Sequence, residues 1–204
     1  MAEKLIQEQF GEAVLTAIRS FARHDLGNLG EYEANYFSHV ADGDLRTALA
    51  ETMYGARWLY KLGLALLVQD AEQLAHVRAQ IFDYASICEG LLGEMIRHAI
   101  ASNITTGQKY RFKDTRKLTG SINWTNEIHA VFETLAFFWC IEVARDENII
   151  DAHLASRLHT LRKQRNSVHL RSRTHKAYID KSRGAFDILL GTIGQTRDWR
   201  NRHP

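Results

Sequence analysis

The sequence predicts an all-helical protein, an up-and-down bundle of about six helices with a long polar loop before the fourth helix. Hydrophobic residues recur at spacings of three and four along most of the chain, which is the period of an amphipathic helix. The only proline is Pro204, the last residue, so no interior position carries the residue that most strongly breaks a helix. Alternating strand patterns are absent, and 45% hydrophobic with 25% charged residues is ordinary for a globular chain.

Three helices are predicted in the N-terminal half. The first covers about residues 5–24, and a segment at 25–33 with two glycines and an asparagine is expected to break it. The second begins near Asp42 to Asp44, whose carboxylates suit a helix N-terminus, and runs to about Val68. The third is the clearest, a central helix of roughly 30 residues. Its apolar stripe is Leu74, Val77, Ile81, Tyr84, Cys88, Leu91 and Met95.

Three more helices are predicted after the polar, glycine-containing segment 102–123, which we interpret as the long loop. The fourth helix covers about residues 124–146. Asp151 is expected to cap the fifth, about 152–170, and the sixth covers about 175–196. We place a domain boundary near residue 70, with an N-terminal helical extension at 1–70 and the main bundle at 71–204.

The charge of +2 conceals a strong asymmetry along the chain. Residues 1–51 carry four basic and nine acidic side chains, giving −5, and residues 52–156 carry ten and twelve, giving −2. Residues 157–204 carry twelve basic and three acidic side chains, giving +9. This positive pole attracts phosphate-bearing partners, although a basic stripe is also found as solvated surface or as a docking face for an acidic protein. The acidic residues 1–70 are themselves a candidate to dock on it.

Several protein classes are disfavoured by the sequence. Apolar runs fall short of the ~20 residues of a membrane span, and the acidic N-terminus lacks the pattern of a secretory signal, so we expect a cytoplasmic protein with no membrane partner. The isolated Cys88 and Cys140 are expected to be reduced core thiols. No histidine pair has the spacing of a zinc helix and no phosphate-binding glycine loop occurs, so neither a metal nor another cofactor is expected.

The fifth helix carries the residues with the most chemistry. Leu154, Leu158, Leu161 and Val168 form its core stripe, and Arg165 falls in the middle of it. Arg162, Asn166 and His169 share one flank. Burying an unpaired guanidinium group is costly, so Arg165 must reach solvent, pair with a carboxylate on another helix, or face a phosphate-binding groove. Glu89 is a candidate carboxylate partner or an orienting acid for His169, and it is equally a candidate solvated acid.

The stretch IIDAHLASRLHTLRKQRNSVHL resembles the signature helix of the HEPN superfamily. The family motif is an arginine, usually followed by a polar residue such as asparagine, and a histidine four to six residues further on. Arg165 is followed by Asn166 but is separated from His169 by three residues, whereas Arg162 has a gap of six but is followed by Lys163. Both alignments remain open. The helix ending in FDYASICEGLLGEMI is similar to the family's first core helix, and the resemblance covers roughly residues 71 to 197.

The resemblance implies a homodimer in which two motif helices form one composite cleft. It further implies a metal-independent endoribonuclease of the toxin–antitoxin or anti-phage defence type, which leaves 2′,3′-cyclic phosphate ends. His169 would be the general acid or base, Arg162 or Arg165 would stabilise charge on the phosphate, and Asn166 would orient the phosphate or the histidine.

The basic residues after the motif would extend a positive track for the RNA backbone. They include Arg171, Arg173 and Lys176. The alternative that the resemblance also implies is a non-catalytic helical module that binds RNA or a protein partner, such as an antitoxin or a nucleotidyltransferase.

Overall fold

The computed structural model describes residues 11–105, 137–166 and 179–204, and all regular structure in these ranges is helical. The prediction of an all-helical fold is therefore confirmed. The helices are α2 Glu12–Arg23, α3 Leu29–Tyr36, α4 Gly43–Ala65, α5 Asp70–Ala101, α7 Phe137–Asp146, α8 Ala152–Asn166 and α9 Ile179–Arg202. Most of the predicted polar loop, from residue 106 onward, lies outside the described residues, as does the start of the fourth predicted helix.

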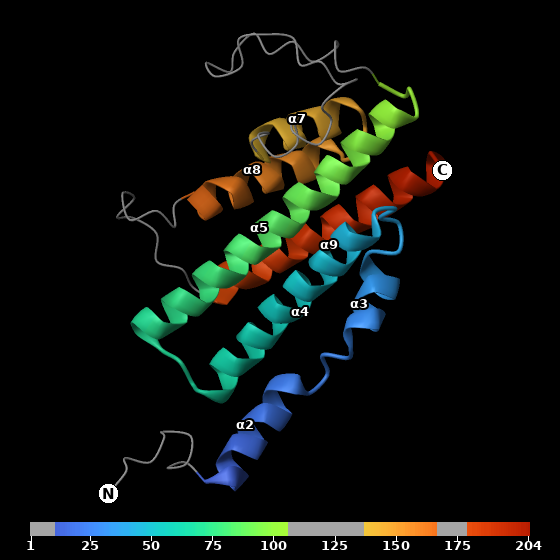
Figure 1. Cartoon of the computed structure of the whole chain (residues 1–204). Coiled ribbons are helices and arrows are strands. Elements are labelled where there is room, and N and C mark those ends of the chain that lie inside the picture. The colour runs from blue at the N-terminus through green and yellow to red at the C-terminus, as the bar shows by residue number, and fades with distance from the viewer. Residues whose placement is uncertain (1–10, 106–136, 167–178) are drawn as a thin grey trace, which may run out of the picture.

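The long helix α5 is the centre of the bundle (Figure 1). It packs against α9, α4, α7 and α8, while α2 and α3 pack against α4. Its predicted stripe is confirmed, because Cys88, Leu91 and Met95 are fully buried. The same core takes in side chains from the other helices, among them Met53 of α4, Trp139 of α7, Leu158 of α8 and Leu189 of α9.

Two predicted helix starts are confirmed by their capping contacts. The Oδ1 atom of Asp42 accepts hydrogen bonds from the backbone N–H groups of Asp44 and Leu45, both at 3.1 Å. Asp151 Oδ1 accepts from Leu154 N–H at 2.6 Å. In both residues the backbone hydrogen bond is the main cause that lowers the pKa of the carboxyl group. These contacts satisfy N–H groups that have no partner within the helix.

The predicted break at 25–33 is wrong in part, because α3 begins inside it. Asn28 and Glu31 form a capping box, in which each side chain accepts from the backbone N–H of the other at 3.1 Å. Gly27 precedes this cap with φ +73°, a conformation that favours glycine. Helix α2 has already ended at Arg23, so Gly27 and Asn28 belong to the start of α3. The sixth predicted helix also extends further than expected, to Arg202.

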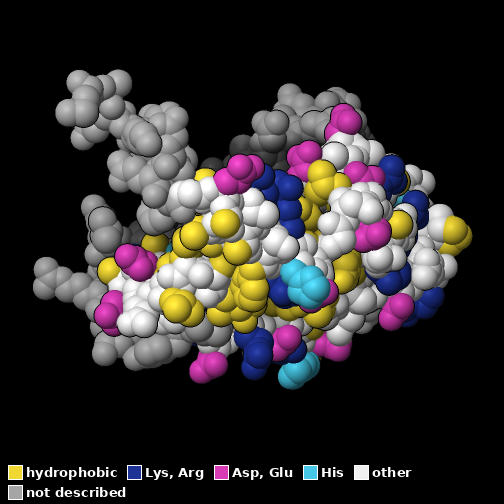
Figure 2. All heavy atoms as spheres, turned by 90° about the horizontal axis from the view of Figure 1, so that it is seen from below, with side chains coloured by type: hydrophobic (Ala, Val, Ile, Leu, Met, Phe, Trp, Pro, Cys, Tyr) yellow, Lys and Arg dark blue, Asp and Glu magenta, His cyan; other side chains and the backbone are white. Residues whose placement is uncertain are grey.

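Helix α2 forms as predicted over its described part, but its apolar face is only lightly packed. Val14 is 47% exposed and Phe21 is 46% exposed, and Ala22 is the buried residue of the helix. Lys61 of α4 covers the Phe21 ring, with Nζ 5.6 Å from the ring centroid. Hydrophobic side chains are accordingly visible on the face that includes α2 (Figure 2). An amphipathic period thus predicts a helix correctly without predicting how deeply it is buried.

The two predicted core thiols, Cys88 and Cys140, are free and buried. Burial raises the pKa of each thiol to about 12, so neither is a thiolate near neutral pH. None of the described helices is long and apolar enough to cross a membrane.

A buried histidine joins the segment after α3 to α9. His39 Nε2 lies 3.0 Å from Thr196 Oγ1, and the Thr196 hydroxyl donates its hydrogen to Thr192 O at 2.8 Å, so Nε2–H of His39 is the donor. Its Nδ1 atom is buried without a hydrogen-bond partner. Burial, together with the charges of Arg197 and Arg200, lowers the pKa of His39 from 6.5 to about 4.

We therefore expect the free energy of unfolding to fall as the pH decreases from 6.5 to about 4. In this window the unfolded chain binds a proton at His39 and the folded chain does not, so the free energy of unfolding rises with pH. Above the unfolded pKa both states are neutral at His39, and its contribution no longer changes with pH. The loss from this group is at most about 3 kcal/mol. Urea unfolding at several pH values should show a smaller pH dependence in His39→Gln than in the parent; equal dependence would contradict this assignment.

Candidate functional site

The candidate site is the basic end of α8, where it faces α7 and α5. Leu154, Leu158 and Leu161 bury one side of α8, as predicted. The helix reaches this position by a tight turn after α7, in which Asn148 has φ +55° and Ile149 N–H returns to Ala144 O at 2.8 Å. Asparagine is among the residues that tolerate this left-handed conformation. The turn makes α7 and α8 an antiparallel hairpin.

Arg165 pairs with a carboxylate on another helix, one of the arrangements considered from the sequence. Its Nη1 lies 2.5 Å from Glu89 Oε2 of α5. Its guanidinium carbon also lies 5.2 Å from the ring centroid of Phe82 and 6.0 Å from that of Phe137. A carboxylate and two aromatic faces thus compensate for removing part of this cation from water. Glu89 is therefore an ion-pair partner rather than a solvated acid.

Arg162 has different surroundings. Its guanidinium carbon lies 5.2 Å from the centroid of the Phe138 ring, and its Nε atom is buried without a hydrogen-bond partner. Among the described residues no carboxylate forms an ion pair with it. Within this part of the chain its positive charge is thus not neutralised by a carboxylate, unlike that of Arg165. Asn166, the last described residue of α8, is exposed.

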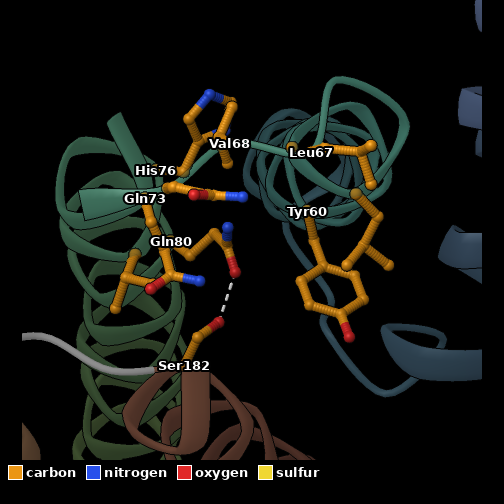
Figure 3. A pocket seen from close by; sticks show the side chains of 11 residues that line it. Tyr60, Leu67, Val68, Gln73, His76, Gln80 and Ser182 are labelled. Carbon is orange, nitrogen blue, oxygen red and sulfur yellow. Dashed lines mark hydrogen bonds between the residues drawn. The ribbon is translucent and has the colours of Figure 1, made fainter. Parts of the chain in front are cut away.

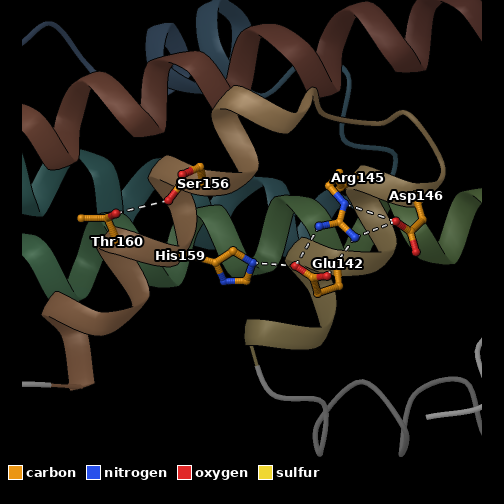
Figure 4. Close-up of polar contacts among 6 residues, drawn as sticks. All are labelled: Glu142, Arg145, Asp146, Ser156, His159 and Thr160. Carbon is orange, nitrogen blue, oxygen red and sulfur yellow. Dashed lines mark hydrogen bonds and ion pairs between the residues drawn. The ribbon is translucent and has the colours of Figure 1, made fainter. Parts of the chain in front are cut away.

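The flank of Arg162 continues into a polar network that the sequence interpretation missed (Figure 4). His159 Nε2 lies 2.6 Å from Glu142 Oε1, and its ring centroid lies 5.2 Å from that of Phe138. Glu142 also pairs with Arg145 at 2.9 Å, which in turn contacts Asp146. The Phe138 ring therefore has His159 and Arg162 as neighbours, and Glu142 fixes the orientation of the imidazole.

A signal for this network was present in the sequence. In an antiparallel hairpin, residues equally far from the turn face each other. The turn at 147–151 is therefore consistent with pairing Glu142 with His159, Phe138 with Arg162 and Phe137 with Arg165. The partner on α5 lacked such a signal, because Glu89 is separated from Arg165 by 76 positions.

The remaining residues of the predicted site fall outside the described residues. These are His169, Arg171, Arg173 and Lys176. Of the predicted set, the structure places Arg162, Arg165 and Asn166 on α8 and brings Glu89 to Arg165. Within the described ranges, no group of three or more histidine, cysteine or acidic side chains is arranged to hold a metal ion.

The contribution of the Glu89–Arg165 pair can be measured with a double-mutant cycle of Glu89→Gln and Arg165→Gln. The two side chains are only 27% and 25% exposed, so we expect a coupling free energy of about 1–2 kcal/mol, above that of a surface pair. The measurement is urea unfolding followed by circular dichroism. The Glu33–Arg46 pair, at 3.6 Å, is the matched control, with an expected coupling below about 0.5 kcal/mol. Equal coupling in the two pairs would show that Arg165 is not specially anchored.

Comparison with known proteins gives no relative for this site: no protein-family model, no curated protein and no solved structure matches the chain.

Proposed function

We propose that this chain is a metal-independent endoribonuclease of the HEPN type, acting in the cytoplasm as a dimer in toxin–antitoxin or anti-phage defence. The observation that carries the proposal is the state of Arg162. Its guanidinium group has no protein anion among the described residues, lies beside an aromatic ring, and stands on the helix that leads in sequence to His169. An uncompensated cation at the basic end of the chain suits a phosphate group of RNA.

The chemistry needs two proton transfers and one stabilised negative charge. The 2′-hydroxyl attacks the adjacent phosphorus and gives up its proton to a base, while the departing 5′-oxygen receives a proton from an acid. His169 is proposed for one of these transfers. Arg162 stabilises the charge that develops on the phosphate oxygens, and Asn166 helps to orient the phosphate or the histidine. The products are a 2′,3′-cyclic phosphate and a 5′-hydroxyl end.

The two open alignments of the arginine can now be ranked. Arg165 already gives its charge to Glu89 at 2.5 Å, so it is proposed to anchor the end of α8 rather than to bind phosphate directly. Arg162 is the proposed phosphate ligand, and it has the motif's longer separation from His169. Arg171, Arg173 and Lys176 are proposed to contact the RNA backbone beyond the cleft.

The second candidate function is a non-catalytic module that binds RNA or a protein partner, such as an antitoxin or a nucleotidyltransferase. It is favoured by the Glu89–Arg165 pair, because a carboxylate close to the motif repels phosphate and halves the free positive charge of the two arginines. Such a module would retain the basic face but not the proton transfers.

The deciding experiment is cleavage of a mixed pool of structured RNAs in EDTA by the parent protein and by His169→Ala. Cleavage with cyclic phosphate ends by the parent, lost in the variant, supports the nuclease. If the two proteins cut equally, the assignment of His169 is wrong. If neither cuts but the parent shifts RNA in a salt-dependent way, the binding module takes first place. The mass of the parent in solution, from light scattering, tests the dimer.

A further inference from the structure

A cavity of about 210 Å³ lies on the other side of α5 from the arginine site. It is a half-open pocket lined by the end of α4, the first turns of α5 and the start of α9 (Figure 3). Tyr60, Leu64 and Val77 supply apolar walls. Gly63 keeps one wall open, because a Cβ atom there would lie 3.2 Å from His76 Nδ1 and 3.3 Å from a Val68 methyl. The volume is below the ~300 Å³ at which sites for drug-sized ligands begin, so a suitable ligand is small.

The base of the cavity holds a buried amide with unused hydrogen-bonding capacity. Gln80 is 1% exposed and Ser182 is 3% exposed. The Ser182 hydroxyl donates to Gln80 Oε1, and Figure 3 shows the Gln80 amide standing between α5 and Tyr60 with its oxygen turned toward Ser182. No described residue accepts a hydrogen bond from Gln80 Nε2. Although the residue as a whole is buried, this nitrogen is not among the fully buried atoms that lack a partner, so it borders the cavity and can donate to water or to a ligand there.

The cavity suits a neutral ligand rather than an ion. None of the described residues that line it is an aspartate, glutamate, lysine or arginine. The Nδ1 atom of His76 lies 3.3 Å from the carbonyl oxygen of Leu59, so this nitrogen is a donor already used within the protein. A charged ligand would lose its hydration without gaining a countercharge.

The mouth of the cavity carries an unusual exposed leucine. Helix α4 ends in a Schellman-type turn, with Val68 N–H bonded to Gly63 O at 3.1 Å and Leu67 N–H to Leu64 O at 3.2 Å. Leu67 has φ +51°, where glycine is the usual residue, and it is 78% exposed. Non-glycine residues with a strained backbone conformation such as this positive φ cluster at functional sites. Leu67 extends the apolar wall outward from the cavity.

From these features we propose that the cavity binds a small, neutral, planar molecule with an amide or lactam edge. The ring packs against Tyr60, Leu64 and Val77. The ligand's carbonyl oxygen accepts from Gln80 Nε2, and its N–H donates to an oxygen of Gln80 or Ser182. This binding site is separate from the arginine site and does not depend on the proposed nuclease activity.

Benzamide is the probe, with benzoate as the charged control of the same shape and size. In NMR titrations of the full chain, benzamide is expected to shift resonances of Gln80, Tyr60 and His76 in a saturable way, and benzoate is expected to bind at least about tenfold more weakly. Equal affinity for the two probes, or no saturable shift with benzamide, would overturn the proposal.

Two variants locate the probe. Gln80→Met keeps the length of the side chain and removes the amide, so benzamide affinity should fall about tenfold, the loss of one hydrogen bond. Leu64→Trp, at a position that is 38% exposed and therefore tolerant, fills the mouth and should abolish binding. Thermal unfolding of both variants shows that they are folded. Unchanged benzamide affinity in Leu64→Trp would show that the probe binds elsewhere, and this result stands even if Gln80→Met does not fold.

Discussion

If the chain is the proposed endoribonuclease, replacing Arg162 with alanine should lower RNA cleavage by about a hundredfold or more while leaving the fold intact. The guanidinium group contacts the Phe138 ring, and its removal breaks no salt bridge among the described residues. Its expected role is instead to stabilise the negative charge of the transition state. The measurement is single-turnover cleavage of one RNA substrate, with thermal unfolding of the same samples to show that stability changes little.

Lys163→Ala is the matched control for this variant. It removes the same charge from the next position of α8, where the side chain is exposed. A general loss of electrostatic attraction would lower cleavage equally in both variants and would be reversed by low salt. A specific phosphate contact affects Arg162→Ala far more. Equal losses would contradict the role assigned to Arg162 and would leave only a diffuse attraction between the basic end and RNA.

Arg165→Ala should behave differently from Arg162→Ala. Because Arg165 pairs with Glu89, its removal also leaves a partly buried carboxylate without a countercharge. We expect a loss of stability together with a loss of activity, whereas Arg162→Ala affects activity alone. This distinction ranks the two candidate arginines of the proposed site in a way that their spacing in the sequence does not.

The sequence predicted most of the helices because their signals are local. The stripe of α5 and the caps at Asp42 and Asp151 depend on residues within a few positions of each other, and the structure agrees with them. The helix α3 was missed because its asparagine and glycine were interpreted as a single break. Asn28 instead caps the start of α3, and the sequence signal for that cap is Glu31 three residues later.

The contacts at the candidate site could be predicted only in part, because they join residues on different helices. The position of Arg165 on a core stripe correctly indicated that its guanidinium group needs a partner, and Glu89 was one candidate. Whether Arg165 reaches Glu89 or solvent depends on how α5 and α8 pack. The contact of His159 with Glu142 depends on the register of the α7–α8 hairpin. The residues of α5 that line the cavity, among them Gln73, Val77 and Gln80, have helical spacing. That spacing does not reveal that the end of α4 and the start of α9 meet them.

Leu161→Ala is expected to have the largest effect on stability at this site, a loss of about 2–5 kcal/mol. Leu161 is fully buried and lies on α8 immediately before Arg162. Truncation removes buried apolar surface and leaves a cavity that α8, held against α5, α7 and α9, closes only in part. The neighbouring Thr160→Ala is the control, because Thr160 is exposed and donates only to Ser156 O at 3.2 Å within its own helix. Its expected loss is below about 0.5 kcal/mol.

Comparing Leu161→Ala with Arg162→Ala separates an effect on stability from an effect on RNA cleavage at adjacent positions of α8. If the core contact of α8 serves only to hold the helix, Leu161→Ala should lower the unfolding temperature and still cleave RNA at nearly the parent rate at temperatures where it is fully folded. Arg162→Ala should show the reverse. A Leu161→Ala protein that unfolds like the parent would show that α8 is not packed into the core as described, since a fully buried leucine cannot be truncated there without cost. In that case the positions assigned to Arg162 and Arg165 would also have to be reconsidered, because the same packing places them.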